Sequence, residues 1–529
     1  MSLKQFPNLG KKTPIILFLV CLFFQSILPL QASSASPQLA LSPDKGSIVG
    51  NNRIDITNYG ASFKDKEHLS VSSGEDHTLA VNSNGKLYSW GGNNNGQLGN
   101  GTTTQSGVPI EVDMSGVLAD KEIKAIEAGR LFSLALDSDG KIYGWGYNYY
   151  GQLGNGTNAV STAPTKTLDT GALAGRKIVQ ISAGYYHTLA LDSEGQVYAW
   201  GNNNQGQLGN GTNTRSNAPV KISAGNIPAG RKIVQVSAGR EHSFALDDAG
   251  QVYSWGTNNR GQLGDGTNNN SNIPVKVSSP QNMTDVKVSK ISSGADHCLA
   301  IDSNGQIYAW GKNQYGQLGN ASTNDSNIPV IINDSGDFVN KNITYLAAGH
   351  NHSFAVGLDG DVFSWGNNFF GQLGNGTTIE RHTPSRIEAN LGATITQITS
   401  FYQHSAVLTA DGHIHTWGWN TQSQIGNNTT TNTLSPIQVN FSSLLNRDIT
   451  SITFDGVEAL SFNVVDGKTI EVVTPPHQPG KVDVVITADD GKTWTLSKGY
   501  EYIDNSSPEQ PAVEVPEEEI RVPSTGSRI

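Results

Sequence analysis

Hydrophobic and polar positions alternate along most of this chain in short runs, which Gly-, Asn- and Asp-rich segments separate. Residues 177–222 show one complete cycle: KIVQISA, HTLALD and QVYAW come first, and APVKI follows a long Asn/Gly loop. Alternation with a period of two predicts half-buried β-strands rather than helices. Each cycle is therefore expected to form four short antiparallel strands.

The cycle recurs along the chain with a Trp-Gly pair as its marker. The spacing is 55 residues, shortened to 52 at the last step, for Trp90, Trp145, Trp200, Trp255, Trp310, Trp365 and Trp417. A repeat of this length indicates a solenoid or a propeller. Gly195 and its equivalents suit the φ > 0 position of a hairpin turn. Seven four-stranded units, each with one structural Trp, predict an all-β fold built around a seven-bladed β-propeller.

The unit resembles the regulator of chromosome condensation repeat, through its A-G-x-x-H-x-L-A-L and W-G-x-N-x-x-G-Q-L-G signatures. The resemblance covers about residues 65–440, and we assign the propeller to residues 64–445. The departures are few: Phe132 replaces the repeat His, Ala321 and Ser423 replace loop Gly residues, and Phe401 replaces the Gly before the repeat His.

Residues 446–503 follow another pattern, in which Asp-Gly and Pro-Gly turns break β-branched runs, as in an immunoglobulin-like sandwich. The motifs T-F-D-G-V, T-P-P and V-D-V-V-I-T resemble the IPT/TIG domain without its opening strands. Residues 36–63 resemble that opening. We therefore hypothesise that the propeller is inserted into one immunoglobulin-like domain, since a closed ring places its termini close together. The alternative is a separate N-terminal strand and a truncated sandwich.

The two ends carry targeting features. Residues 1–35 have the form of a signal peptide, with two Lys before an apolar run and Ser33-Ser34-Ala35 at a suitable cleavage position. Residues 504–529 form an acidic, Pro-rich linker. Its Val522-Pro523-Ser524-Thr525-Gly526 resembles a sortase cell-wall anchor, either separated from its apolar span or present by chance. We expect a secreted or cell-surface protein.

Composition and charge narrow the function classes. The net charge is −11 and no Lys/Arg run occurs. Such a surface repels a phosphate backbone, so nucleic acid is not expected as a partner. Of the two cysteines, Cys21 lies in the N-terminal apolar segment, which leaves Cys298 alone in the mature chain. A disulfide framework or a cysteine metal site within one chain is therefore excluded, and we predict neither a metal nor a cofactor.

Several repeated residues invite a chemical interpretation that packing explains better. Six histidines recur at one position: His77, His187, His242, His297, His352 and His404. Each belongs to its own blade, too far from its copies to share a metal, and we interpret each as tying a turn together. Cys298 fills a position otherwise held by Thr or Ser, and is expected to be small and buried. His415 replaces a repeat Tyr, so packing is favoured for the pair His413 and His415.

Other motifs also belong to the repeat. Asp137-Ser138-Asp139-Gly140 faintly resembles a calcium loop but lacks the remaining ligands. Asn-Gly-Thr triplets match a glycosylation sequon, but they recur because the loop needs Asn and Gly: Asn100, Asn155, Asn210 and Asn375. Neither a Ser/His/Asp set nor a pair of carboxylates stands apart from the repeat, so we assign no catalytic residue.

Positions that vary between repeats are the more informative ones. The loops between strands one and two and between strands three and four emerge on one face of an antiparallel meander. They hold ten aromatic side chains: Tyr147, Tyr149, Tyr150, Tyr185, Tyr186, Tyr315, Phe369, Phe370, Tyr402 and Trp419. Variable loops on a scaffold carry function, and aromatic side chains anchor interfaces. We predict one binding patch on units two and three, and another on units five to seven. The alternative is that these side chains only pack neighbouring loops.

These features predict an exported, non-enzymatic and monomeric binding protein whose loop face takes an unknown protein or a glycan near the cell surface. The resemblance implies nucleotide exchange on a nuclear GTPase with chromatin binding, which the signal-like N-terminus and the acidic charge argue against. Secreted bacterial inhibitors of β-lactamase share this propeller and support protein binding. The alternatives are a carbohydrate-binding adhesin and, with less support, a quinoprotein propeller enzyme, whose Asp–Gly–Trp pattern overlaps the repeat.

Overall fold

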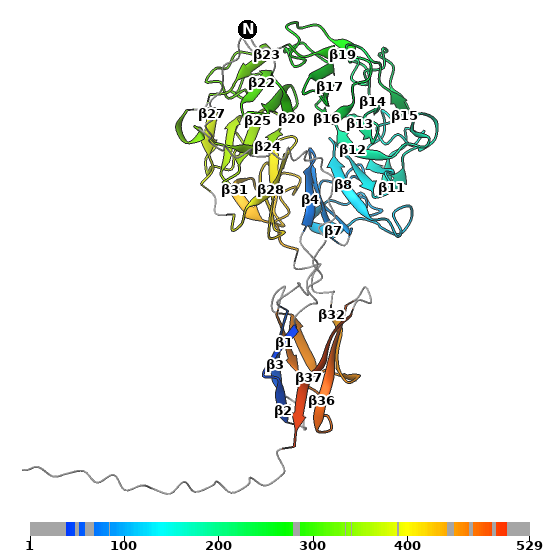
Figure 1. Cartoon of the computed structure of the whole chain (residues 1–529), viewed down its shortest axis with the longest axis vertical. Helices are drawn as coiled ribbons and strands as arrows, with labels where there is room; N and C mark the ends of the chain where they lie inside the picture. The colour runs from blue at the N-terminus through cyan, green and yellow to red at the C-terminus, as the bar shows by residue number, and fades with distance from the viewer. Residues whose placement is uncertain are drawn as a thin grey trace, which may run out of the picture. The chain divides into compact units, whose positions relative to one another are not determined.

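The computed structural model describes residues 39–47, 52–58, 68–83, 85–278, 286–333, 335–339, 341–388, 391–441, 449–464, 469–488 and 493–504. These residues form strands and turns, with no α-helix among them, and two short 3₁₀ helices, η1 (Gly171–Leu173) and η2 (Gly336–Phe338) (Figure 1). No helix in this part of the chain is long and apolar enough to cross a bilayer. The all-β class is confirmed. The signal-like segment and the sortase-like motif lie outside the described residues.

Within the described part of the chain, seven four-stranded antiparallel sheets repeat one design, with the strands of each sheet side by side in chain order. The first four sheets are β4 (His68–Ser73), β5 (His77–Asn82), β6 (Leu87–Gly91) and β7 (Ser106–Glu111); β8 (Ile123–Ala128), β9 (Phe132–Asp137), β10 (Ile142–Gly146) and β11 (Ser161–Lys166); β12 (Ile178–Ala183), β13 (His187–Asp192), β14 (Val197–Gly201) and β15 (Ser216–Lys221); and β16 (Ile233–Ala238), β17 (His242–Asp247), β18 (Val252–Gly256) and β19 (Ser271–Lys276).

The remaining three sheets of this kind are β20 (Val288–Ser293), β21 (His297–Asp302), β22 (Ile307–Gly311) and β23 (Ser326–Ile331); β24 (Ile343–Ala348), β25 (His352–Gly357), β26 (Val362–Gly366) and β27 (Arg381–Arg386); and β28 (Ile395–Ser400), β29 (His404–Thr409), β30 (Ile414–Gly418) and β31 (Thr433–Gln438). The first strands of successive sheets contact one another, and β28 contacts β4 (Figure 1). The sheets are thus the blades of a closed propeller, numbered one to seven in chain order.

The repeat Trp packs between neighbouring blades. Trp145 is fully buried in a cluster with Leu79 and Val81 of the preceding blade. Its indole Nε1 donates to the carbonyl of Gln97, also in the preceding blade, at 2.9 Å. Gly99 must remain Gly, because its φ is +69° and a Cβ there would lie 2.6 Å from the same indole nitrogen. The Trp-Gly period of the sequence therefore records contacts between blades.

The ring closes with the bonds that join consecutive blades. Trp90 of the first blade donates to the carbonyl of Gln424 in the last blade at 2.9 Å. The side-chain oxygen of Gln397 accepts from the backbone N–H of Val71 at 3.0 Å. Gln235 makes the same bond to Ile291 between blades four and five. Closure therefore follows from the repeat itself and needs no special element.

Two further sheets combine strands from both ends of the described chain, in the orders β1-β3-β35-β34 and β2-β37-β36-β32-β33. Their strands are β1 (Leu39–Ser42), β2 (Lys45–Ser47), β3 (Arg53–Asn58), β32 (Ile449–Phe454), β33 (Val457–Glu458), β34 (Ser461–Val464), β35 (Thr469–Val473), β36 (Gly480–Ala488) and β37 (Thr493–Ile503).

Both sheets contribute to one hydrophobic core. Ile54 and Ile56 of β3 lie opposite Val472 and Ile470 of β35, and they are buried together with Phe454 of β32. These contacts join strands that precede and follow the propeller in the chain, and insertion of the propeller into one domain stays a prediction. The immunoglobulin-like class of these sheets stays a prediction.

Candidate functional site

The loop between the first two strands of a blade is a tight turn that presents two variable side chains. In the third blade the N–H of Gly184 donates to the carbonyl of His187 at 2.9 Å. A Cβ on Gly184 would lie 2.4 Å from the His187 ring, so the turn needs Gly. The first residue after this Gly, or after Phe401 in the last blade, forms a ring of seven positions: Glu75, Arg130, Tyr185, Arg240, Ala295, His350 and Tyr402.

The ten predicted aromatic side chains lie in contacting clusters, which we call the aromatic face. On blades two and three, the rings of Tyr150 and Tyr186 are 4.9 Å apart between centroids, and Tyr147 and Tyr149 adjoin them. On blades five to seven the corresponding ring pairs are Tyr315–Phe369, Phe370–Trp419 and Tyr402–Trp419.

Exposure divides these side chains into two kinds. Tyr149 and Phe369 are 57% and 61% exposed, whereas Tyr185 is only 7% exposed. The Tyr185 ring contacts both Tyr186 and, at 5.3 Å between centroids, Phe401 of the last blade. Tyr185 therefore packs between the two predicted patches, as the packing alternative expects, while Tyr149 and Phe369 remain available to a partner.

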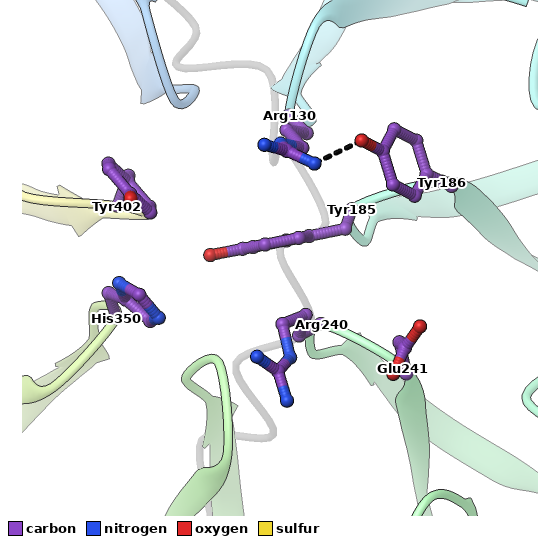
Figure 2. A pocket seen from close by; sticks show the side chains of 7 residues that line it. All are labelled: Arg130, Tyr185, Tyr186, Arg240, Glu241, His350 and Tyr402. Carbon is purple, nitrogen blue, oxygen red and sulfur yellow. Dashed lines mark hydrogen bonds between the residues drawn. The ribbon is translucent and has the colours of Figure 1, made fainter. Parts of the chain in front are cut away.

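A cavity of about 400 Å³ opens within the aromatic face, and we call it the central pocket. Its lining consists of Arg130, Tyr185, Tyr186, Arg240, Glu241, His350 and Tyr402. Figure 2 shows Tyr185 extending toward His350 and Tyr402, with Arg130 and Arg240 on either side of its ring. His350 and Tyr402 stack at 4.7 Å between ring centroids and 19° between planes. Five of the seven ring positions thus meet in one pocket.

Each guanidinium of the pocket is matched by a carboxylate. Arg130 forms an ion pair with Glu75, donates to the hydroxyl of Tyr186 and lies over the Tyr186 ring, 5.2 Å from its centroid. Arg240 Nη2 lies 2.9 Å from Asp296 Oδ1. Burial raises the pKa of Glu75, and the bond and charge of Arg130 oppose that rise. The pocket is therefore rich in hydrogen-bonding groups but has little unmatched positive charge.

Three polar atoms of the pocket are shielded from solvent and have no hydrogen-bond partner within the protein: Tyr185 Oη, His350 Nδ1 and Arg240 Nε. Burial lowers the pKa of His350 to about 3, and the nearby cations Lys312 and Arg240 add to this effect. The imidazole is therefore neutral near pH 7. Burial also holds the pKa of Tyr185 well above its usual value, so its phenol is protonated. Each of the three groups can donate a hydrogen bond.

Five of the six repeat histidines join neighbouring blades rather than tying their own turns, and His242 has no hydrogen-bond partner at either ring nitrogen. His187 Nε2 lies 2.9 Å from the hydroxyl of Ser243 in the next blade. The same bond joins His77 to Ser133, His297 to Ser353, His352 to Ser405 and His404 to Thr78. Burial lowers the pKa of His187 to about 3. Among the described residues, no group of three or more His, Cys, Asp or Glu side chains could hold a metal ion.

The remaining motif residues serve local structure. The carboxylate of Asp137 accepts from the backbone N–H of Lys141 and from the Tyr143 hydroxyl. His415 is buried, whereas the neighbouring His413 forms an ion pair with Asp411. In the sequon loops, Asn155 Oδ1 accepts from the N–H and hydroxyl of Thr157. These contacts agree with the structural interpretations of the motifs.

Sequence reasoning missed five residues of the site. Arg130, Arg240, Glu241 and His350 line the central pocket, and Glu75 pairs with Arg130. All five occupy the variable turn positions that Tyr185 and Tyr186 also occupy. A search for every non-recurring side chain, instead of aromatic ones alone, would have found them.

Comparison with known proteins places the propeller in a family. Residues 34–286 and 169–465 match the model of the RCC1-like domain. The Ultraviolet-B receptor UVR8 of Arabidopsis thaliana is 33% identical over 322 residues, which cover 61% of this chain and 70% of that protein. The E3 ubiquitin-protein ligase HERC2 of Homo sapiens is 31% identical over 372 residues, which cover 69% of this chain but 7% of that protein.

Two solved structures show the same fold at lower identity. Human WBSCR16 has a TM-score of 0.59 at 22% identity, over 74% of this chain and 99% of its own. Prp20p of Saccharomyces cerevisiae has a TM-score of 0.59 at 23% identity, over 79% of this chain and 94% of its own. Propeller blades of the predicted repeat type are thereby confirmed.

The expectation about partners needs correction. From the sequence, neither nucleic acid binding nor GTPase exchange was expected, and an unknown protein or glycan bound by a monomer was expected instead. That expectation was wrong, because Prp20p, which shares this fold, is described with its binding properties to the GTPase Gsp1p and to histones. Net charge is a sum over the whole chain, whereas recognition depends on the local chemistry of a face. By its repeat signatures, its propeller blades and its matched residues, this chain belongs to the RCC1-like domain family.

Proposed function

We propose that this protein is a non-enzymatic interaction module whose aromatic face binds a partner protein. RCC1-like propeller proteins mediate protein interactions. The observation that supports this use of the face is the presence of exposed Tyr149 and Phe369 on the loop face that also holds a pocket with two arginines. Tyr and Arg are among the side chains that dominate the binding energy of interfaces.

The arrangement suits binding more than catalysis. The carboxylates next to the pocket arginines are committed to ion pairs, and burial keeps the imidazole of His350 neutral. Exposed Tyr149, by contrast, lies beneath Arg215, whose guanidinium is 5.4 Å from the ring centroid. Such a pair offers a flat, amphipathic surface at low conformational cost.

We also propose export of the mature protein to the cell surface, based on the signal-like residues 1–35. The N-terminus of the protein purified from its own host is expected near Ser36. An intact N-terminus on the protein recovered from the cell interior would contradict export and leave the interaction role in place.

The interaction role is tested by capture with the full chain as bait. The first variant carries Tyr149→Ala and Phe369→Ala, which remove exposed rings without touching the buried core. The control variant is Leu358→Ala, which removes an equally exposed side chain in the turn between β25 and β26. A true partner is retained by the wild type and the control and lost by the double variant.

The captured protein is then purified and its affinity for each bait is measured directly. Each anchor ring is expected to contribute about 2 kcal/mol, or roughly 30-fold in Kd. Equal affinity for wild type and double variant, with both proteins folded, would remove the aromatic face from the proposal.

A further inference from the structure

We propose that the central pocket binds an uncharged amide, namely the side chain of an Asn or Gln at the tip of a loop of the partner protein. This inference rests on the proposed function, because it names the group that the partner inserts. It concerns Tyr185, Arg240 and His350, whereas the proposed function rests on the exposed rings around them.

Charge balance argues for a neutral ligand. Arg130 is paired with Glu75, Arg240 is paired with Asp296, and half-buried Lys312, a further nearby cation, is also attracted to Asp296. The carboxyl group of Asp76 adjoins Glu75, so a carboxylate or phosphate would find no excess of positive charge. An ammonium group would face the two guanidinium groups directly. Glu241 adds a further negative charge to the lining and disfavours an anion again. The pocket therefore selects against both signs of charge.

Hydrogen-bonding capacity argues for an acceptor. Tyr185 Oη, His350 Nδ1 and Arg240 Nε all lack a partner within the protein, and each can donate. Buried polar groups without partners are rare in native proteins and typically mark a place where a ligand or water completes them. An amide oxygen accepts two hydrogen bonds, and the NH₂ group of the same amide can donate to the carboxylate of Glu241 in the lining.

The shape of the pocket favours a flat group at the end of a short side chain. The ring of Tyr185 and the stacked pair of His350 and Tyr402 present planar walls (Figure 2). Ala295, the small member of the ring of seven positions, contributes only a methyl group between Arg240 and His350. A cavity of about 400 Å³ admits one side chain with the tip of its loop, but not a folded domain.

The first experiment uses four peptides of sequence acetyl-Ser-Gly-X-Gly-Ser-amide, with Gln, Glu, Lys or Met at X. Binding to the full chain is measured by saturation-transfer NMR, which detects complexes of millimolar Kd, the strength expected for one inserted side chain. The Gln peptide is expected to bind about tenfold more tightly than any of the others. Equal or tighter binding of the Glu or Lys peptide would overturn the inference.

Variants then locate the binding site. Tyr185→Phe removes one hydrogen-bond donor and keeps the ring, and Arg240→Gln removes a second donor. Each substitution is expected to raise the Kd of the Gln peptide about fivefold or more. The control Tyr345→Phe removes a hydroxyl from β24, outside the pocket lining. Thermal melting verifies that each variant is folded. If the Gln peptide binds both pocket variants as tightly as the wild type, its binding site lies elsewhere and the inference is wrong.

The outcomes separate this inference from the proposed function. Loss of partner capture by the Tyr149→Ala, Phe369→Ala variant, combined with no Gln selectivity, keeps the interaction role and rejects the amide pocket. The converse result is that the Gln peptide is selected in a way that depends on Tyr185 while the partner is captured equally well without the exposed rings. That result supports the amide pocket and rejects the aromatic face as the binding surface.

Discussion

At the residue scale, the residue after the repeat His position carries a hydroxyl in six of the seven blades, and at most junctions this hydroxyl makes two bonds between blades. Ser243 donates to the carbonyl of Gln207 at 2.8 Å, and His187 Nε2 lies 2.9 Å from the same hydroxyl oxygen. Because the hydroxyl hydrogen is committed to the carbonyl, the imidazole must be the donor. At position 298 the hydroxyl is replaced by a thiol, and both ring nitrogens of His242 are left without a partner.

Cys298→Ser is expected to restore this pair of bonds and to raise the free energy of unfolding by about 1 kcal/mol. The reverse change at an intact junction, Ser353→Cys, is expected to lower it by about 1–3 kcal/mol, because His297 then loses its partner. Urea unfolding followed by Trp fluorescence measures both values. The assignment fails if the two substitutions shift stability in the same direction.

At the element scale, the first strands of the blades are joined by a ring of short polar side chains. The hydroxyl of Ser182 in β12 accepts from the N–H of Ala238 in β16, and Ser237 and Ser292 repeat this bond in later blades. In β8 the equivalent residue is Glu127, whose carboxyl is hydrogen bonded to the N–H of Ala183. Its side chain is partly exposed yet densely surrounded by protein, and this burial raises its pKa to about 8.

Glu127→Gln is expected to stabilise the protein in alkaline but not in acidic solution. The pKa of Glu127 is higher in the folded chain, about 8, than its ordinary value of 4.5, so the charged form is disfavoured on folding. The contribution of the neutral Glu127 side chain to the stability of the protein is therefore complete below pH 4.5 and is lost as the pH rises through 8. Unfolding curves at pH 5 and pH 9 measure the difference. A stability change that is equal at both pH values, or that also appears in the exposed control Glu111→Gln, would contradict this origin.

At the scale of the whole molecule, buried imidazoles make the propeller sensitive to acid. Burial lowers the pKa of five repeat histidines to about 3, below the ordinary value of 6.5: His77, His187, His242, His297 and His404. The unfolded chain therefore binds more protons in acid than the folded chain. The stability from these groups is complete above pH 6.5 and is lost as the pH falls toward 3. The raised carboxyl pKa values of Asp76 and Glu127 act in the opposite direction.

The contribution of one His is isolated by His187→Phe, a change that the second blade carries naturally as Phe132. Between pH 6 and pH 4, the slope of the unfolding free energy against pH is expected to fall by up to about 1.4 kcal/mol per pH unit. Urea unfolding at several pH values gives the slope. An unchanged slope would mean that His187 is protonated in the folded protein.

The second feature of the whole molecule is the core shared by strands from its two ends. Removal of residues 37–58 would expose the side chains that Ile54 and Ile56 cover, so the sheets of residues 449–503 are expected to lose their fold. Proteolysis of this region, followed by mass spectrometry, measures the effect, and a synthetic peptide of residues 37–60 is expected to restore protection. A protease-resistant segment 449–503 in the shortened chain would favour two independent parts.

Much of the fold could be predicted from the local pattern of the sequence. The period of two, the turn Gly residues and the recurring Trp predicted the strands and the propeller repeat, because blades are built from neighbouring strands with the same contacts each time. The same regularity marked Gly195 as a turn residue and the repeat His as structural. It also marked the variable loops as the place to look for function.

The sequence alone determined the repeat, the all-β class and the face on which non-recurring side chains lie. Only the tertiary structure decided which of those side chains meet: it joined Tyr185 of the third blade to Phe401 of the last, and set Arg240 beside His350. These contacts join residues far apart in the chain, so no local period encodes them. The difference between a buried Tyr185 and an exposed Tyr149 likewise depends on the curvature of a closed ring, which brings the first turns together at its centre and keeps the outer loops in solvent.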